Sequence, residues 1–282
     1  MQSEQTTTLI HQIETACLWE AEAPKAGNVH PDASFDNLTH NDFVRSARIT
    51  AFMLSRIDAR GVSQSILDAV RAVQLQVGKN TNLGIVLLLA PLTAVPNQQS
   101  LTETLPSIID ALDIEDTCRI YEAINLAHPG GMAQVENQDL STAPTLTVKE
   151  VMQLAQQHDM IARQYANNFS DVLGFGLERL AHWWSVSDGN RNQAIVGFHL
   201  DWMAHYPDTL IQRKCGQDVA EKSASQAEEI LQSDWPNSPQ SQEKFTEFDT
   251  WLRAAGNKRN PGTSADLVAA CLFVGLREKI IS

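Results

Sequence analysis

Apolar residues recur every three or four positions along most of the 282-residue chain. This spacing places them on one face of an α-helix, whereas the alternating patterns and hairpin turns that indicate β-strands are nearly absent. The pattern therefore predicts an all-α fold. The predicted helices cover residues 8–21, 42–57, 62–77, 83–95, 101–112, 114–127, 148–167, 171–185, 190–205, 218–231, 241–255 and 263–281.

One of these segments, residues 83–95, is almost entirely apolar and contains Pro91. A helix that crosses a bilayer needs about 20 apolar residues, so this segment is too short to do so. We expect it to be a buried core helix, and we expect no contact with a membrane.

The helical pattern breaks at residues 128–131, which read His-Pro-Gly-Gly, and the chain stays irregular through Thr147. Loops of this length are often functional or disordered. No fixed-period repeat is visible, which disfavours a solenoid. These features predict a single globular bundle of about ten or more helices over residues 1–282, with a long irregular loop near 128–147.

The formal net charge of −13 argues against a general nucleic-acid-binding protein, which would carry a broad basic surface. The four cysteines are far apart and form no CxxC pair, so reduced, buried thiols are favoured over a zinc or redox site. The first residues show no basic stretch followed by an apolar one, so we expect no secretory signal and a cytoplasmic protein.

The sharpest polar segment, residues 257–267, reads N-K-R-N-P-G-T-S-A-D-L and precedes the last apolar helix. Helix capping and the helix dipole explain Asp266, but they do not explain two cations ahead of a glycine turn. The arrangement suits a phosphate chain with bound Mg²⁺, in which the carboxylate holds the metal and the cations neutralise the phosphates. The candidate phosphate-binding residues here are Lys258, Arg259, Asn260, Gly262 and Ser264.

A second polar segment, residues 78–84, reads G-K-N-T-N-L-G and directly precedes the core helix. Capping explains any one of Asn80, Thr81 and Asn82, but not all three behind a lysine. A helix N-terminus directed at an anion explains the set, because free N–H groups and the helix dipole both favour negative charge.

Two further segments are weaker when taken alone. Residues 24–30 place Lys25 and Asn28 beside a glycine, which suits phosphate binding but also simply ends a helix. Residues 206–214 place Asp208 near Arg213 and Lys214. That spacing fits a charged surface helix and a metal-binding aspartate with phosphate-binding cations about equally well.

Two other patterns have simple structural explanations. His158-Asp159 is similar to the dipeptide of HD-type metal phosphohydrolases, but no other His or Asp pair has a convincing metal spacing. Trp183-Trp184 could stack on a base, yet aromatic residues at helical spacing are more often part of a core.

Taken in order, the loops resemble the motifs of the triphosphoribosyl-dephospho-CoA synthase family, which are P-K-P-G, H-x-D-M, N-T-H-K-G, D-T-N…R and S-P-G-G-x-A-D-L. Five motifs in the same order, over almost the whole chain, are far more specific than any one. The matching residues are Pro24-Lys25-Ala26-Gly27, His40-Asn41-Asp42-Phe43, Asn80-Thr81-Asn82-Leu83-Gly84, Pro207-Asp208-Thr209 with Arg213, and Asn260-Pro261-Gly262-Thr263-Ser264-Ala265-Asp266-Leu267.

The resemblance implies an all-helical enzyme that takes ATP and Mg²⁺. Such an enzyme joins the 5-triphosphoribosyl group to a hydroxyl of dephospho-CoA and releases adenine, and its product is a prosthetic-group precursor for citrate and malonate lyase systems. The chain departs from the motifs at Ala26, His30 and Leu83. Its middle segment is similar to a branch associated with one-carbon metabolism and tetrahydromethanopterin-type cofactors. The implied acceptor is therefore dephospho-CoA or a related CoA-like or pterin-type precursor.

The resemblance also implies roles for the candidate residues. Lys25, Arg213, Lys258 and Arg259 would bind phosphates, and Asn80 and Asn82 would bind phosphate or ribose. Asp208 and Asp266 would be metal ligands and Asp42 the general base or carbocation stabiliser, although these roles could be exchanged among the three catalytic aspartates. The alternatives are a metal-dependent phosphohydrolase that uses His158-Asp159 and a non-catalytic nucleotide- or cofactor-binding protein. A homodimer would be ordinary for a helical enzyme of this size.

Overall fold

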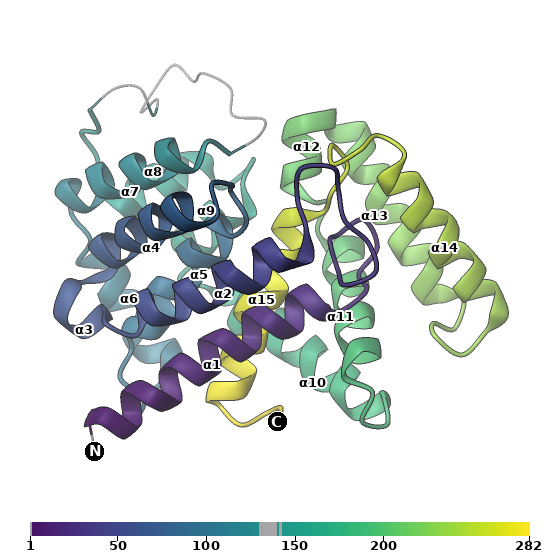
Figure 1. The fold of residues 1–282 in the computed structure, drawn as a ribbon, viewed down its shortest axis with the longest axis horizontal. Coiled ribbons are helices and arrows are strands. Elements are labelled where there is room, and N and C mark those ends of the chain that lie inside the picture. Colours follow the sequence, from purple (N-terminus) through teal and green to yellow (C-terminus); the bar gives the residue numbers. More distant parts are fainter. Residues whose placement is uncertain (1, 130–139, 141–142) are drawn as a thin grey trace.

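The computed structural model describes residues 2–129, 140 and 143–282, with the backbone alone for residues 2–5. Over these residues the chain forms fifteen α-helices and one π-helix, with no β-strand longer than an isolated bridge, so the predicted all-α class is confirmed (Figure 1). The predicted loop near 128–147 falls mostly outside the described residues; residues 143–147 are not helical. The elements are α1 Gln2–Glu22, α2 His40–Leu54, α3 Ile57–Arg60, α4 Val62–Gln76, α5 Leu83–Ala94, α6 Leu101–Asp110, α7 Ile114–Ala127, α8 Val148–Ala155, α9 Met160–Ala166, η1 Val172–Gly176, α10 Leu177–Val186, α11 Arg191–His205, α12 Thr209–Cys215, α13 Gln217–Gln232, α14 Pro239–Arg253 and α15 Gly262–Arg277.

Two apolar helices, α5 and α15, form the centre of the fold. Every residue of α5 from Leu83 to Thr93 is buried, as expected for a helix that is apolar on all sides. Helix α15 packs against α5 and also against α1 and α11, so it connects the two sides of the molecule. In Figure 1, α1–α9 lie mainly on one side of α15 and α11–α14 on the other. The first turns of α5 and α15 thereby come together in the interior.

The second side has a smaller core of its own. Buried apolar residues of α11, α12, α13 and α14 form this cluster, which includes Leu200, Ile211, Ala227 and Phe248. Ala26, from the loop after α1, belongs to the same cluster. The loop that carries the P-K-A-G segment is therefore attached to the α11–α14 side.

The predicted helix at 148–167 is two helices, α8 and α9, and the prediction of one continuous helix is wrong. The break occurs at Asp159, whose Oδ1 accepts hydrogen bonds from the backbone N–H groups of Ile161 (2.8 Å) and Ala162 (3.1 Å). This N-cap begins a new helix although the apolar periodicity continues across it. A similar cap at Asp208 begins α12, a helix that the apolar periodicity did not predict, although the charge spacing of residues 206–214 fitted a helix there.

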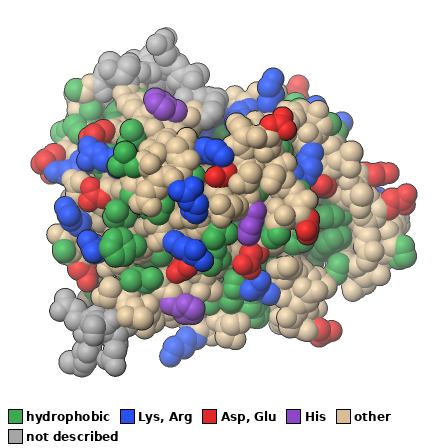
Figure 2. Space-filling view, viewed as in Figure 1, with side chains coloured by type: hydrophobic (Ala, Val, Ile, Leu, Met, Phe, Trp, Pro, Cys, Tyr) green, Lys and Arg blue, Asp and Glu red, His purple; other side chains and the backbone are tan. Residues whose placement is uncertain are grey.

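None of the helices that the structure describes is both long enough and apolar enough to cross a membrane. On the face shown in Figure 2, Lys and Arg side chains are interspersed with Asp and Glu. The cations of this face form no continuous patch.

Candidate active site

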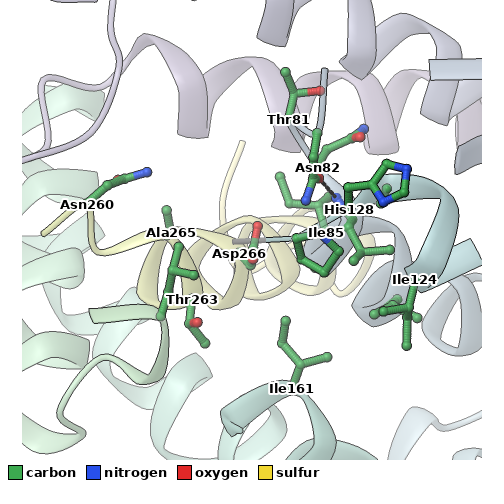
Figure 3. A pocket seen from close by; sticks show the side chains of 18 of the residues that line it. Thr81, Asn82, Ile85, Ile124, His128, Ile161, Asn260, Thr263, Ala265 and Asp266 are labelled. Atoms are coloured by element: carbon green, nitrogen blue, oxygen red, sulfur yellow. Dashed lines mark hydrogen bonds between the residues drawn. The ribbon is translucent and has the colours of Figure 1, made fainter. Parts of the chain in front are cut away.

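A cavity of about 1040 Å³ lies where the first turns of α5 and α15 meet the loops before them. Its other walls come from α7, α8 and α9, from the end of α1 and from α12. In Figure 3, Asn260 lies at one end, Ile124 and His128 lie at the other, and Asp266 lies between them. Polar residues line the Asn260 end, and apolar residues of α7 and α8 line the opposite end.

Asp266 faces the cavity from the first turn of α15, and no group in the described part of the chain donates a hydrogen bond to its carboxylate. The carboxylate lies directly against the backbone of Gly84, where an added Cβ would be 2.0 Å from Asp266 Oδ2. The glycine that ends the N-T-N-L-G segment is thus needed to make room for the carboxylate. Two motifs that are 182 positions apart in the sequence are in direct contact here.

The electrostatic surroundings of Asp266 favour positive charge beside it. Burial raises the pKa of Asp266 well above its usual value, and the carboxylates of Glu20, Asp208 and Asp159 raise it further, against the opposing effect of Arg213. A cation close to Asp266 would relieve this repulsion.

Glu20, near the end of α1, was not among the sequence-predicted residues, yet it lines the cavity and is 4% exposed. Its Oε1 lies 2.9 Å from the Nζ atom of Lys25, which is fully buried and does not line the cavity. Lys25 was predicted to bind phosphate, but it lies outside the cavity and its charge is already paired with that of Glu20. A buried lysine requires an acidic partner, and this requirement is the signal that could have identified Glu20 as a site residue from the sequence.

Two cations of the cavity, Arg213 and Lys214, come from α12, and a third, Lys79, comes from the loop before α5 and is ion-paired with Asp42. Arg213 forms an ion pair with Asp159, and both residues line the cavity. Lys214 also lines it, donates a 3.4 Å hydrogen bond to the carbonyl of Asn257, and has no carboxylate partner among the described residues. Burial lowers the pKa of Lys214, although the nearby charge of Asp208 acts in the opposite direction. Lys214 is thus a partly buried positive charge that an anionic ligand would neutralise.

Two asparagines join the loops at the polar end. Nδ2 of Asn28 donates a 2.6 Å hydrogen bond to Oδ1 of Asn260, and both residues line the cavity. The Oδ1 atom of Asn28 is buried and has no hydrogen-bond partner among the described residues. An unpaired buried acceptor is costly, and a hydroxyl of a bound ligand would satisfy it.

The residues before α5 also line the cavity. Oδ1 of Asn80 accepts a 3.3 Å hydrogen bond from the N–H of Leu83, and the side chain of Thr81 is hydrogen-bonded to Ser46 at 2.5 Å. Nδ2 of Asn82 donates a 2.5 Å hydrogen bond to Thr50. These contacts fix the loop against α2, so the predicted set of Asn80, Thr81 and Asn82 lies together at the cavity.

Several predicted residues lie elsewhere. Lys258 is exposed and does not line the cavity. Arg259 lies over the ring of Trp251, 4.5 Å from its centroid, and donates a 2.9 Å hydrogen bond to the Trp251 carbonyl. The turn at 257–262 does line the cavity, but through Asn257, Asn260 and Gly262.

Asp208 and Ser264 connect α12 to α15 and do not line the cavity. Oδ1 of Asp208 accepts the N–H groups of Leu210 and Ile211 at 2.9 Å each, and its Oδ2 accepts the N–H (2.7 Å) and hydroxyl (2.9 Å) of Ser264. Its oxygens are therefore fully engaged by protein donors, which leaves little capacity for the expected role as a metal ligand.

Asp42 likewise does not line the cavity. Its Oδ2 accepts hydrogen bonds from Lys79 Nζ (2.8 Å) and from the N–H and hydroxyl of Thr39 (2.9 Å each). Burial acts to raise the pKa of Asp42, but these hydrogen bonds lower it overall. Asp42 caps α2 and holds the 78–84 loop, so the structure gives it a positioning role.

No group of three or more His, Cys, Asp or Glu side chains in the described residues is placed to hold a metal ion. A nucleotide-bound Mg²⁺ needs fewer protein ligands, usually one or two carboxylates together with phosphate oxygens. Asp266, whose carboxylate is open to the cavity, fits that requirement. His158 is exposed and the neighbouring Asp159 is bound to Arg213, so the phosphohydrolase alternative has no support.

The described residues form a helical fold with a large cavity lined by several carboxylates and by a lysine that has no carboxylate partner among them, an arrangement that suits a phosphorylated substrate. The sequence profile of the ATP:dephospho-CoA triphosphoribosyl transferase family matches residues 6–282, and the chain belongs to this family. It is therefore a transferase of the class that moves the triphosphoribosyl group of ATP to dephospho-CoA.

A solved structure supports the fold assignment. It is a crystal structure of a protein from Archaeoglobus fulgidus, provisionally described as a triphosphoribosyl-dephospho-CoA synthase. The likeness has a TM-score of 0.65 at 22% identity and covers 83% of this chain and 98% of that one. No curated protein sequence matches the chain significantly.

Proposed function

We propose that the cavity binds ATP with its triphosphate at the end formed by Lys214, Arg213 and Asn260, and with the reacting ribose beside Asp266. The observation that carries this proposal is the position of Lys214, a partly buried cation that lines the cavity without a carboxylate partner in the described residues. The unpaired Oδ1 of Asn28 supplies an acceptor at the same end.

The chemistry of the transfer fits the carboxylates of the cavity. The bond between the anomeric carbon and adenine breaks, a bond from that carbon to an acceptor oxygen forms, the acceptor hydroxyl loses its proton, and adenine takes up a proton on a ring nitrogen as it leaves. The anomeric carbon passes through an oxocarbenium-like state, which carboxylates such as Asp266 and Asp159 stabilise by their charge. Glu20 lines the cavity and would take the role of general base that the sequence suggested for Asp42, so it would accept the hydroxyl proton. When bound, Mg²⁺ would be held by Asp266 and the triphosphate and would neutralise phosphate charge.

The experiment is a reaction of the purified chain with ATP, Mg²⁺ and dephospho-CoA, analysed by liquid chromatography and mass spectrometry. We expect adenine and a triphosphoribosyl-dephospho-CoA product in equal amounts. Release of phosphate without adenine, or tight ATP binding without any product, would contradict the proposal.

The acceptor can be tested in the same assay. We propose dephospho-CoA as the first acceptor, and a reduced pterin precursor with a sugar hydroxyl, as used in one-carbon metabolism, as the second. Both offer the same nucleophile, so the faster rate of adenine release identifies the substrate. We also propose a cytoplasmic location, because the donor is ATP, and a homodimer; cell fractionation and sedimentation test these two points.

A further inference from the structure

Lys25 is a buried charge to which the proposed transfer gives no role. Its side chain is fully buried, and its Nζ atom lies 2.9 Å from Oε1 of Glu20. The same atom donates hydrogen bonds to the backbone carbonyls of Glu20 and of Ala23, the latter at 3.5 Å. An ammonium group has three N–H donors, and these three acceptors use all of them. Lys25 therefore has no donor left for a phosphate.

The backbone that follows Lys25 is held against α14. The N–H of Gly27 donates a 2.8 Å hydrogen bond to Oδ1 of Asp249. Asp249 is in turn paired with Arg253 (2.8 Å), which donates a 2.5 Å hydrogen bond to the carbonyl of Asn28. These contacts fix the loop after α1, so the protein itself sets the position of Lys25 before any ligand binds.

Glu20 connects this buried charge to the cavity. It lies in the last turn of α1, lines the cavity and is 4% exposed. Lys25 holds its Oε1, and no described residue donates a hydrogen bond to its other carboxylate oxygen, Oε2. The charge of Glu20 also acts on Asp266, beside which the reacting ribose is placed. A carboxylate with one oxygen held and the other free is oriented for a proton transfer at this point.

Capping of α1 explains only part of this arrangement. A lysine often donates to the last carbonyls of a helix, which accounts for the two backbone contacts. It does not account for a buried ion pair whose carboxylate lines a cavity, because a carboxylate in this position needs a partner to remain charged. His199 of α11 is also close to Lys25, but burial and then the charge of Lys25 hold the pKa of His199 well below its usual value. That ring stays neutral, so Glu20 is the counter-charge of Lys25.

Resting on the proposed function, we infer that Lys25 is a positioning residue of the transfer, which holds Glu20 as a carboxylate with Oε2 turned to the acceptor hydroxyl and makes no contact with ATP. The hydroxyl proton passes to Oε2 as the hydroxyl oxygen bonds to the anomeric carbon and the bond to adenine breaks. Adenine leaves with the electron pair of that bond and takes up a proton on a ring nitrogen, so no net proton is released. The lysine of the P-K-A-G segment thus acts on the base and not on the phosphates.

The test compares Lys25→Met, Glu20→Gln and the double variant. Lys149→Met is the control, because Lys149 pairs with Asp110 at 2.6 Å and neither residue lines the cavity. We expect Lys25→Met to lower kcat at least about 100-fold with the KM for ATP within about twofold, whereas Lys149→Met should change neither value. Lys25→Met leaves a buried carboxylate without its partner and the double variant does not, so the double variant should unfold at a urea concentration closer to that of the wild type.

The double variant gives the decisive comparison, and it holds even where Lys25→Met alone fails to fold. If Lys25 acts through Glu20, the double variant should match Glu20→Gln in kcat and in the KM for ATP within about threefold, because the base is already absent. A larger fall in kcat would overturn the inference by showing that Lys25 acts independently of Glu20. A larger rise in the KM for ATP would overturn it by showing that Lys25 binds phosphate. A double variant that does not fold would show that Lys25 is needed for capping alone, which also overturns it.

The same assays separate this inference from the proposed function. If the wild type releases no adenine from ATP, Mg²⁺ and dephospho-CoA, the proposed function fails. If the wild type releases adenine and Glu20→Gln keeps the wild-type kcat, Glu20 is not the base, and the inference fails while the cavity remains the site of the transfer.

Discussion

The contact between Gly84 and Asp266 allows a prediction with a worked magnitude. An alanine Cβ at position 84 would lie 2.0 Å from Asp266 Oδ2 and 2.6 Å from the Cδ1 atom of Ile161. Unstrained contacts begin near 3.5 Å, so the Asp266 carboxylate would have to move by about 1 Å or more.

The expected effects on stability and on activity differ in size. Replacing glycine by alanine inside a helix gains about 1 kcal/mol, and overpacking costs about 1–3 kcal/mol, so Gly84→Ala should lower the free energy of unfolding by only about 0–2 kcal/mol. A displacement of about 1 Å of a catalytic group can reduce the rate about 100-fold. We therefore expect a folded protein with a large loss of adenine release.

The assay combines urea unfolding with chromatographic measurement of adenine. Gly174→Ala is the control, because Gly174 is exposed, lies in the π-helix and has no atom within 4 Å of an added Cβ. It should keep wild-type activity. Wild-type activity in Gly84→Ala would refute the reasoning about Asp266, and loss of activity through unfolding alone would refute the estimate of stability.

Three further substitutions test other parts of the site. Lys214→Met should raise the KM for ATP about tenfold by removing the unpaired cation, whereas Lys258→Met should leave it unchanged because Lys258 is exposed outside the cavity. Asp208→Ala should lower the free energy of unfolding by about 2–4 kcal/mol, measured with urea, because it removes the cap of α12 and two hydrogen bonds to α15. Asp171→Asn tests pH dependence: burial acts to raise the pKa of Asp171, but hydrogen bonds from residues that include Arg163 lower it overall. Its ionised form thus stabilises the fold above the ordinary value of 3.8 and loses this effect as the pH falls through the lower folded value, so the wild type and Asp171→Asn should differ in stability at pH 6 and converge below about pH 4.

Each of these three predictions has a result that contradicts it. Equal ATP KM values for the two lysine variants would remove Lys214 from the phosphate site. An Asp208→Ala protein as stable as the wild type would show that the α12 cap is dispensable. A stability difference for Asp171→Asn that grows toward acid pH would show that the pKa of Asp171 is raised in the folded state.

The sequence predicted helices well where the apolar face and the ends agreed. The bounds of α7 coincide with the predicted 114–127, and the apolar run at 83–95 is the buried core helix α5. The prediction from apolar periodicity failed at Asp159, where an N-cap starts a new helix although the periodicity continues across it. Periodicity reports burial and does not report which backbone N–H groups a side chain captures.

The candidate site was predicted as a set of loops but not as a set of side-chain directions. Asn80, Asn82, Arg213, Asn260 and Asp266 line the cavity together. Lys258 and Arg259 lie beside Asn260 in sequence yet do not line it, because each residue of a turn points in a different direction. The turn itself was identified correctly, whereas the cations that line the cavity come from α12 and from Lys79 in the loop before α5.

The most direct test of the central claim is quantitative analysis of adenine and triphosphoribosyl product from ATP, Mg²⁺ and dephospho-CoA, with the wild type and with Asp266→Asn. The site described here predicts equal amounts of adenine and product from the wild type. It predicts that Asp266→Asn unfolds at the same urea concentration as the wild type but shows no turnover. Unchanged adenine release by folded Asp266→Asn would contradict the assignment of this cavity as the active site.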